Sequence, residues 1–392
     1  MPRNSNFERD FRLVSGKRLR CGYTTGLCAQ AAAKAAAQMA LAAGAVEAAA
    51  VGSVEVTAPS GKNFRLAVED VQAGAGWASC AVRKDAGDDP DVTDGILVYA
   101  KVEKAACGGI VIDGGIGVGR VTKPGLDRKP GEAAINSTPR KMIERECHAV
   151  AEAAGYTGGL LVTISIPAAV ELAKRTFNPK VGIEGGISVL GTSGIVEPVS
   201  ENAYIESIKI ELRQRYAEGA RSLLVLVGNF ARDFAFDELG LSSAPSVKCS
   251  NFIGAALSGA AELGFERLLL VGHLGKAVKL ALGIVNVHSS HGDGRIEAII
   301  ACALEAGAGL DTLRALAACI STDAAVAVLE AAGLFVPAMR VLERRISETV
   351  RRLMPPGVEA GFVVFCKEGA ERRGKIAVQS SNAPALAAAL LK

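Results

Sequence analysis

The chain has 392 residues, of which 49% are hydrophobic and 22% charged, and its formal net charge is +3. This length exceeds the size at which a single hydrophobic core stops growing, so it predicts two or more domains. The small charge and few aromatic residues argue against nucleic-acid binding, and no uninterrupted run of roughly 18 apolar residues predicts a membrane span. The first twenty residues lack an apolar signal segment, so we expect a cytoplasmic protein with reduced thiols. The composition leaves open that the protein binds an anionic small molecule.

An alanine-rich segment near the N-terminus predicts a helix from about Gly26 to Ala43, because alanine is the best helix former. Thr24 or Thr25 would cap the start of this helix, and Gly44 would end it. A helix N-terminus surrounded by hydroxyl groups could also hold an anion. Plain capping is the alternative use of the two threonines.

Four strands are predicted next, at residues 51–57, 63–69, 77–84 and 96–104, and a turn at 59–61 would join the first two. The segment 85–94, between the last two strands, contains five aspartates. Its spacing does not match a calcium-binding loop, so we expect a solvated acidic loop, with contact to a polar ligand as the alternative.

The first glycine-rich region follows a strand that we expect to end at Ile110–Ile112. Residues 114–119 read as a loop, with Arg120 and Lys123 just beyond it. Backbone N–H groups beside two cations suit a carboxylate or a phosphate. The alternating glycines, which include Gly117 and Gly119, do not form a dinucleotide-binding motif, and close strand packing or a bulge is the alternative.

The second glycine-rich region, residues 181–200, comes after a helix at 138–154, a strand at 159–166 and a short helix at 167–175. Within it, Ile187 to Leu190 is long enough for a strand. The polar turn Gly191-Thr192-Ser193-Gly194 follows directly. The region is either a connector between domains or a loop whose backbone and hydroxyl groups approach a ligand closely.

The remaining chain changes to alternating helices and strands, which implies parallel pairing. We expect helices at 200–218 and 250–263, with apolar strands at 223–227 and 268–271. Ligands bind at the carboxyl ends of such strands, which here carry Gly228 and Asn229, then Gly272 and His273.

A helix to about residue 282 and a polar cluster at 287–295 follow the second apolar strand. Lys276 lies outside any phosphate-loop motif but could bind a carboxylate. A metal site formed by His273, His288 and His291 is conceivable, and proton-transfer or supporting roles are equally open.

The C-terminal part predicts four helices between 295 and 354, strands at 362–366 and 375–379, and a helix at 383–391. We therefore expect an α+β domain over residues 1–190. An α/β domain with a mainly parallel sheet would follow over residues 191–392.

Several of these motifs together resemble the CbiD family, the cobalt-precorrin-5B C-1 methyltransferases of anaerobic cobalamin biosynthesis. The resemblance is carried, in the order of the chain, by residues 19–26, 117–125, 178–188, 191–198, 272–276 and 288–295. The chain departs from the family pattern at Leu27, at Leu274 and at Ser290-His291, so the resemblance implies no role for His291.

The resemblance implies transfer of a methyl group from S-adenosylmethionine to C-1 of a cobalt-containing tetrapyrrole, in a CbiD-like two-domain architecture. Cobalt would arrive within the substrate, so no protein metal site is expected, and assembly into a homo-oligomer is left open. The residues that we expect to bind the methyl donor are Glu184, Gly185, Gly186, Gly191, Thr192, Ser193, Gly194, Gly228, Asn229 and Gly272. Those expected to bind the tetrapyrrole are Thr24, Thr25, Asp113, Gly117, Gly119, Arg120, Lys123, Lys276 and Arg295.

Candidates for a catalytic group are His273, His288 and Asp293. Two other classes of protein stay open, namely a non-catalytic corrinoid carrier and a kinase-like enzyme with glycine-rich loops.

Overall fold

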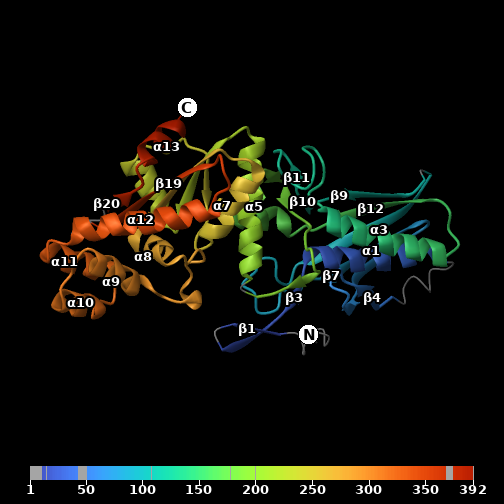
Figure 1. Cartoon of the computed structure of the whole chain (residues 1–392). Helices are drawn as coiled ribbons and strands as arrows, with labels where there is room; N and C mark the ends of the chain where they lie inside the picture. The colour runs from blue at the N-terminus through green and yellow to red at the C-terminus, as the bar shows by residue number, and fades with distance from the viewer. Residues whose placement is uncertain are drawn as a thin grey trace. The chain divides into compact units, whose positions relative to one another are not determined.

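A computed structural model describes residues 11–14, 16–42, 51–106, 108–176, 178–198, 200–367 and 374–391. The chain forms two compact units, Met1–Ser200 and Glu201–Lys392, and the mixed α/β fold expected from the sequence is confirmed (Figure 1). This division lies later than the expected boundary because the segment after residue 190 contacts the first unit. There, β15 (Ile195–Val196) pairs with β3 (Gly22–Tyr23).

The core of the first unit is a five-stranded sheet covered by two helices. Its strand order is β6 (Glu69–Gly74), β7 (Trp77–Arg83), β8 (Leu97–Ala105), β12 (Gly159–Ser165), β9 (Ile110–Gly114). Only the β12–β9 pair is parallel. Helix α1 (Thr25–Leu41) packs against β7, β8 and α3 (Ser137–Ala153), as Figure 1 shows.

The small side chains of α1 explain its central place. All its alanines are buried, because a helix of alanines can approach a sheet and a second helix closely. Thr24 caps the helix as expected, since its hydroxyl accepts a hydrogen bond from the Leu27 N–H at 3.2 Å. The helix ends at Leu41, with Ala42 as its extended C-cap, slightly before the expected end at Ala43, and Gly44 lies outside the described residues.

Other strands of the first unit pair in hairpins. The expected hairpin forms from β4 (Ser53–Thr57) and β5 (Asn63–Ala67), whereas β1 (Phe11–Val14) with β2 (Lys17–Arg20) was not expected. The predicted continuation of one strand through Glu69 is wrong. Instead β6 begins at Glu69 and pairs with β7, and the positive φ of 51° at Asp70 interrupts the regular register.

Short elements complete the unit where longer ones were expected. The expected helix at 167–175 divides into α4 (Ala169–Leu172) and a 3₁₀ turn (Ala173–Arg175). The expected strand Ile187–Leu190 is wrong, because β14 (Gly186–Ile187) ends at Ile187 and Val189 forms only an isolated bridge with Ile135.

The second unit is built on the sheet β17 (Ser246–Lys248), β16 (Ser222–Val227), β18 (Arg267–His273), β19 (Glu359–Lys367), β20 (Gly374–Gln379), in that order. All neighbours are parallel except β19 and β20. The strand expected at 362–366 is β19, which continues the parallel arrangement beside β18. The strand β17 was missed, because three residues give too short a pattern.

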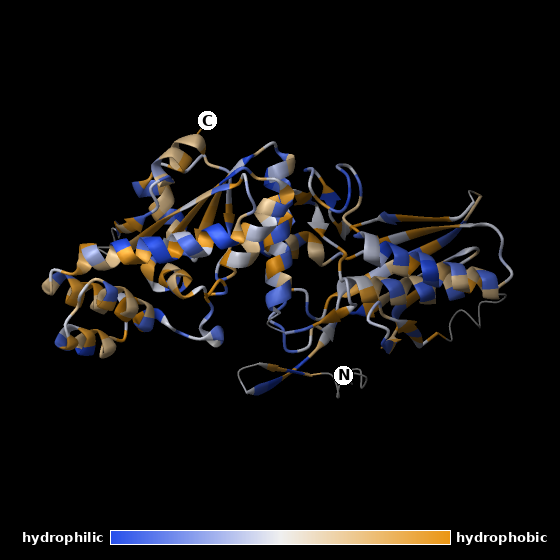
Figure 2. Ribbon diagram, viewed as in Figure 1, coloured by the Kyte–Doolittle hydropathy of each residue, from blue (hydrophilic) through white to orange (hydrophobic). Residues whose placement is uncertain are grey.

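Both faces of this sheet are buried, which explains its continuous apolar strands. In β16, Leu223, Val225 and Val227 pack in one cluster while Leu224 and Leu226 pack in another. Figure 2 shows the consequence, with strands that are orange along their length and a long helix, α12 (Phe335–Leu353), that alternates between orange and blue.

Helices surround the sheet of the second unit. The helices expected at 200–218 and 250–263 are α5 (Glu201–Ala217) and α7 (Ile253–Leu263), whereas α6 (Phe230–Asp233) was not expected. The four expected C-terminal helices are confirmed as α9 (Arg295–Glu305), α10 (Leu310–Ala317), α11 (Thr322–Ala331) and α12, and α13 (Ala383–Ala389) follows β20. After β18, α8 (Leu274–Ala277) continues as a 3₁₀ helix (Val278–Leu282). Within the described ranges, no helix combines the length and the apolar character that crossing a membrane requires.

Candidate functional site

The two glycine-rich regions of the first unit pair directly with each other. Strand β10 (Gly117–Val118) lies parallel to β14, and β11 (Arg120–Val121) lies antiparallel to β13 (Ile183–Glu184). Gly117 has φ of +77°, and a Cβ atom there would stand 1.8 Å from the carbonyl oxygen of Ile166. Close strand packing, the alternative weighed from the sequence, therefore accounts for a glycine at this position.

The start of α1 lies against the turn at 190–194. The Thr25 hydroxyl accepts a hydrogen bond from the Leu190 N–H at 3.1 Å and donates one to the Leu190 carbonyl at 3.3 Å. A Cβ atom at Gly191 would stand 2.2 Å from the Thr24 hydroxyl oxygen. Both threonines are buried, and their hydroxyl groups are used to cap the helix and to hold this turn.

Charged side chains lie on the exposed side of the paired glycine strands. Arg120 donates two hydrogen bonds to the Asp113 carboxylate, at 2.8 and 2.9 Å, and lies opposite Glu184 in the β11–β13 register. The hydrogen bonds from Arg120 hold the pKa of Asp113 below its usual range. The structure thus brings together Asp113 and Arg120, which were expected to bind the tetrapyrrole, and Glu184, which was expected to bind the methyl donor. The Asp113 carboxylate already neutralises the Arg120 guanidinium.

The remaining predicted residues of this unit differ in exposure. The aliphatic part of the Lys123 side chain lies against Gly182, and a Cβ atom on Gly182 would stand 2.5 Å from the Cγ of Lys123. Among the residues expected to bind the methyl donor, some are exposed, namely Glu184, Gly185, Thr192 and Ser193, while others are buried, namely Gly186 and Gly194. Gly119 is buried beside Gly186.

In the second unit, the carboxyl ends of three parallel strands carry polar residues, which the sequence predicted for β16 and β18 but not for β17. Gly228 and Asn229 follow β16, Lys248 ends β17, and Gly272 and His273 end β18. The Lys248 ammonium donates to the Asn229 side-chain oxygen at 2.6 Å.

The imidazole of His273 is oriented by its neighbours. Its Nδ1 accepts a hydrogen bond from the Gly275 N–H at 3.1 Å, so in the neutral ring the proton is on Nε2. This Nε2 lies 3.9 Å from an Asp323 carboxylate oxygen, and the ring packs edge-on against Phe365.

A cavity of about 300 Å³ opens beside this edge of the sheet. Four predicted residues line it, namely Lys276, His288, Asp293 and Arg295. Three more lining residues, Gly275, Val287 and Ser289, belong to the motif 272–276 and the polar cluster 287–295 but were not predicted individually. Sequence reasoning missed Asn251 and Lys279. Asn251 closely follows β17, so recognising that short strand would have identified it. A second cavity, of about 470 Å³ and lined by helical residues that include Arg344, Arg345 and Arg352, contains no predicted residue.

The loop that carries His288 is held by Lys279. This side chain is only 3% exposed, and its ammonium donates to the carbonyl oxygens of Val287 at 3.3 Å and Gly292 at 2.8 Å. The Val287 N–H in turn donates to the Asn251 carbonyl at 2.8 Å. The cavity wall is therefore tied to the start of α7 and to the 3₁₀ helix after α8.

The charges of the cavity favour an anionic ligand. Lys276, Lys279 and Arg295 are cationic, whereas Asp293 is the one carboxylate among the lining residues. Two hydrogen bonds join Arg295 to Asp293, and they hold the pKa of Asp293 below its usual range.

The three-histidine metal site considered from the sequence gains no support from the geometry. His291 contacts the Glu201 carboxylate at 3.0 Å, while His273 faces Asp323. Across the ranges that the structure describes, no group of three or more His, Cys, Asp or Glu side chains is arranged to hold a metal ion.

Comparison with known proteins gives one consistent family. The CbiD family matches residues 12–198, and the CbiD C-terminal domain matches residues 286–379. The cobalt-precorrin-5B C(1)-methyltransferase of Ruminiclostridium cellulolyticum is 47% identical over 83% of this chain and 83% of its own. The enzyme of the same name from Alkaliphilus metalliredigens is 42% identical over 91% of this chain and 92% of its own.

A crystal structure of a cobalamin biosynthesis protein (cbiD) from Archaeoglobus fulgidus aligns with 68% of this chain and 80% of its own, at 31% identity and a TM-score of 0.37. The family models cover most of the chain, and the relatives are similar along nearly their whole length. The chain therefore belongs to the CbiD family.

Proposed function

We propose that this chain is a cytoplasmic enzyme that transfers a methyl group from S-adenosylmethionine to C-1 of cobalt-precorrin-5B, giving cobalt-precorrin-6A and S-adenosylhomocysteine. The observation that carries the proposal is the similarity, over most of both chains, to proteins named cobalt-precorrin-5B C(1)-methyltransferase. Cobalt belongs to the substrate in this reaction, so the reaction requires no metal site of the protein.

The chemistry needs alignment more than a nucleophilic side chain. An electron-rich ring carbon attacks the methyl group in line with the S–C bond of the sulfonium. The new C–C bond forms as the S–C bond breaks, and the electron pair of the broken S–C bond remains on sulfur. Holding both reactants in this geometry and excluding water supplies most of the rate enhancement.

The proposed donor site uses the exposed edge of the paired glycine strands. Glu184 would accept hydrogen bonds from the ribose hydroxyl groups, and Gly185, Thr192 and Ser193 are exposed nearby in the sequence. In the second unit, Gly228, Asn229 and Gly272 at the strand ends are the further donor-binding candidates.

The tetrapyrrole carries several carboxylate side chains, for which cations are the natural partners. Arg120, Lys123, Lys276 and Arg295 are the cations proposed to bind them. His288 and Asp293 face the same cavity as Lys276 and are the candidates for moving a proton there, and His273 orients its Nε2 near the same sheet edge.

Calorimetric titration with S-adenosylmethionine and S-adenosylhomocysteine tests the proposal. We expect both to bind, and a protein that binds neither compound would contradict a methyltransferase. Binding of a corrinoid without either sulfur compound would instead indicate a carrier, and ATP turnover would indicate a kinase-like enzyme.

The variant Glu184→Ala tests the proposed donor site. We expect it to weaken S-adenosylhomocysteine binding by about 10-fold or more, because loss of a hydrogen bond to a charged group costs about 1.5–3 kcal/mol. The control is Glu171→Ala, which removes an exposed carboxylate of the same unit that pairs only with Lys174 among the described residues. Equal affinity of both variants would remove Glu184 from the site.

A further inference from the structure

The cations proposed to bind substrate carboxylates differ in how far their charges are already used. Arg120 makes two hydrogen bonds to Asp113, and Arg295 makes two to Asp293. A bidentate guanidinium–carboxylate pair is a well-matched arrangement, so a ligand carboxylate would have to compete with the aspartate already present. A ligand carboxylate would therefore bind either arginine only by sharing it with, or displacing, the paired aspartate.

Lys276 is different. Its side chain lies over the backbone that follows β16, where a Cβ atom on Gly228 would stand 3.3 Å from the Lys276 ammonium nitrogen. Across the described ranges, no acceptor lies within hydrogen-bonding or ion-pair distance of this ammonium group. The group is half-buried and lines the cavity of about 300 Å³.

The groups nearest to Lys276 do not balance its charge. Burial lowers the pKa of Lys276, and the ammonium groups of Lys248 and Lys279 lower it further. The nearby Cys249 does not compensate, because burial raises the pKa of its thiol to about 12 and keeps it neutral at pH 7. A half-buried charge without a counter-charge is costly, and an anionic ligand would remove that cost.

We propose that Lys276 binds a carboxylate group of a ligand in this cavity, and that it is the main anion-binding residue of the second unit. Lys279 also lines the cavity and adds positive charge, while its ammonium group holds the loop that carries His288. The Arg295–Asp293 pair borders the same cavity. The inference rests on the proposed function for which molecule carries the carboxylate, whereas the expectation that Lys276 binds a carboxylate does not depend on that function.

The size of the cavity limits what enters it. At about 300 Å³ it lies at the lower end of the ~300–1,000 Å³ range of small-molecule sites. A whole tetrapyrrole with its side chains does not fit such a volume. The carboxylate therefore arrives either on a peripheral side chain of the tetrapyrrole or as the amino-acid end of the methyl donor.

Calorimetry with three probes distinguishes these two sources. The probes are S-adenosylhomocysteine, cobyrinic acid, whose side chains end in carboxylates, and cobinamide, whose side chains end in amides. The variants are Lys276→Met, Lys276→Arg, and, as a control, Lys209→Met, which removes an exposed lysine of the same unit. We expect Lys276→Met to weaken binding of one carboxylate probe about 10- to 100-fold, Lys276→Arg to restore much of it, and the control to match the parent.

The probe that loses affinity identifies the source of the carboxylate. Loss of cobyrinic acid binding with unchanged binding of cobinamide assigns Lys276 to the tetrapyrrole, whereas loss of S-adenosylhomocysteine binding assigns it to the methyl donor. Unchanged affinity for both carboxylate probes in Lys276→Met would overturn the proposal. Misfolding is not expected to confuse the result, because removing an uncompensated charge should leave Tm equal to or above that of the parent.

A second measurement does not depend on the proposed function. The rate at which acetic anhydride modifies Lys276, followed by peptide mass spectrometry, should fall when propionate is added and should not fall with chloride at equal ionic strength. If the parent protein binds neither S-adenosylhomocysteine nor cobyrinic acid, the methyltransferase proposal fails while this labelling still decides the role of Lys276. Equal labelling rates in propionate and chloride would then overturn the inference.

Discussion

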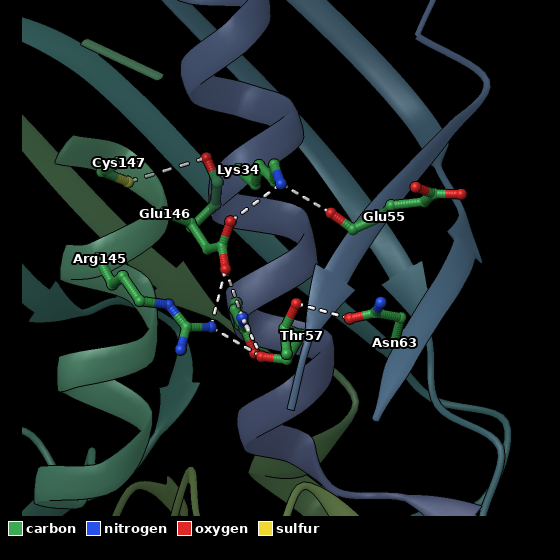
Figure 3. A network of polar contacts seen from close by, with 9 residues as sticks. Lys34, Glu55, Thr57, Asn63, Arg145, Glu146 and Cys147 are labelled. Carbon is green, nitrogen blue, oxygen red and sulfur yellow. Dashed lines mark hydrogen bonds and ion pairs between the residues drawn. The ribbon is translucent and has the colours of Figure 1, made fainter. Parts of the chain in front are cut away.

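A buried carboxylate between α1 and α3 of the first unit offers the sharpest test of what stabilises that unit. Figure 3 shows the Glu146 carboxylate of α3, which accepts hydrogen bonds from Lys34 at 2.9 Å and Arg145 at 2.9 Å, and it also accepts one from Gln30 at 2.8 Å. Burial alone would raise the pKa of Glu146, but the three hydrogen bonds outweigh it and hold the pKa below the ordinary value of 4.5. The perturbation is Glu146→Gln, which keeps the shape and removes the charge.

The expected cost follows from what each donor retains. The Lys34 ammonium also donates to the Glu55 carbonyl at 2.7 Å, and Arg145 also donates to the Thr57 carbonyl at 2.7 Å. Neither cation is therefore left without an acceptor, and the Arg145 side chain is 52% exposed and can reach water. Hydrogen bonds to a charged group contribute about 1.5–3 kcal/mol, so we expect a total loss of about 2 kcal/mol rather than the larger cost of an isolated buried charge.

The assay uses the only tryptophan of the chain. Trp77 lies in β7 of the first unit, so its fluorescence during urea unfolding of the full chain reports on that unit. At pH 7 we expect Glu146→Gln to lower the free energy of unfolding by about 2 kcal/mol and Tm by about 4–8 °C for a unit of this size. The control Glu55→Gln removes an exposed carboxylate paired with Arg65 and should cost less than about 1 kcal/mol.

The pH dependence gives a second check with a definite sign. Because the pKa of Glu146 is lowered in the folded state, its contribution is fully present above the unfolded value of 4.5 and is lost as pH falls through the folded pKa. The difference between parent and Glu146→Gln should therefore shrink below pH 4.5. A cost under about 0.5 kcal/mol at pH 7, or a difference that grows in acid, would refute the reasoning.

Two further substitutions test the close strand packing and the cavity wall. Gly117→Ala should lower the free energy of unfolding of the first unit by more than about 2 kcal/mol. The added Cβ would collide with the Ile166 carbonyl oxygen, and the positive φ of residue 117 disfavours alanine. An unchanged urea midpoint, measured by Trp77 fluorescence, would contradict this expectation. Lys279→Met should speed amide hydrogen exchange in the loop that Lys279 holds by about 10- to 100-fold, since two carbonyl groups lose a charged donor, whereas Lys209→Met should leave that exchange unchanged.

The elements that could be predicted from the sequence are those whose signal is local or long. The alanine-rich composition of α1 and the threonine at its start predict a capped helix, because helix propensity and capping act within a few residues. The apolar runs of β16 and β18 predict a sheet covered on both faces, because strands without alternation have no solvent face.

Other features depend on residues far apart in the chain and left no such pattern. The strand β17 has three residues, and its place at the edge of the sheet comes from pairing with β16. Residues 114–119 were expected as a loop, whereas they include β10, which pairs with β14 some seventy residues later in the sequence.

The candidate site shows the same division between sequence and tertiary structure. The sequence by itself identified most of the charged residues around the cavity and, through its motifs, the CbiD family, because residue type and spacing carry chemical meaning without coordinates. Only the tertiary structure decided which charges are already used, since Arg295 is paired with Asp293 two positions away while Lys276 has like charges beside it. Whether an ammonium group finds an acceptor depends on the packing of strands and loops from distant segments, and that packing is set by the whole chain rather than by any one motif.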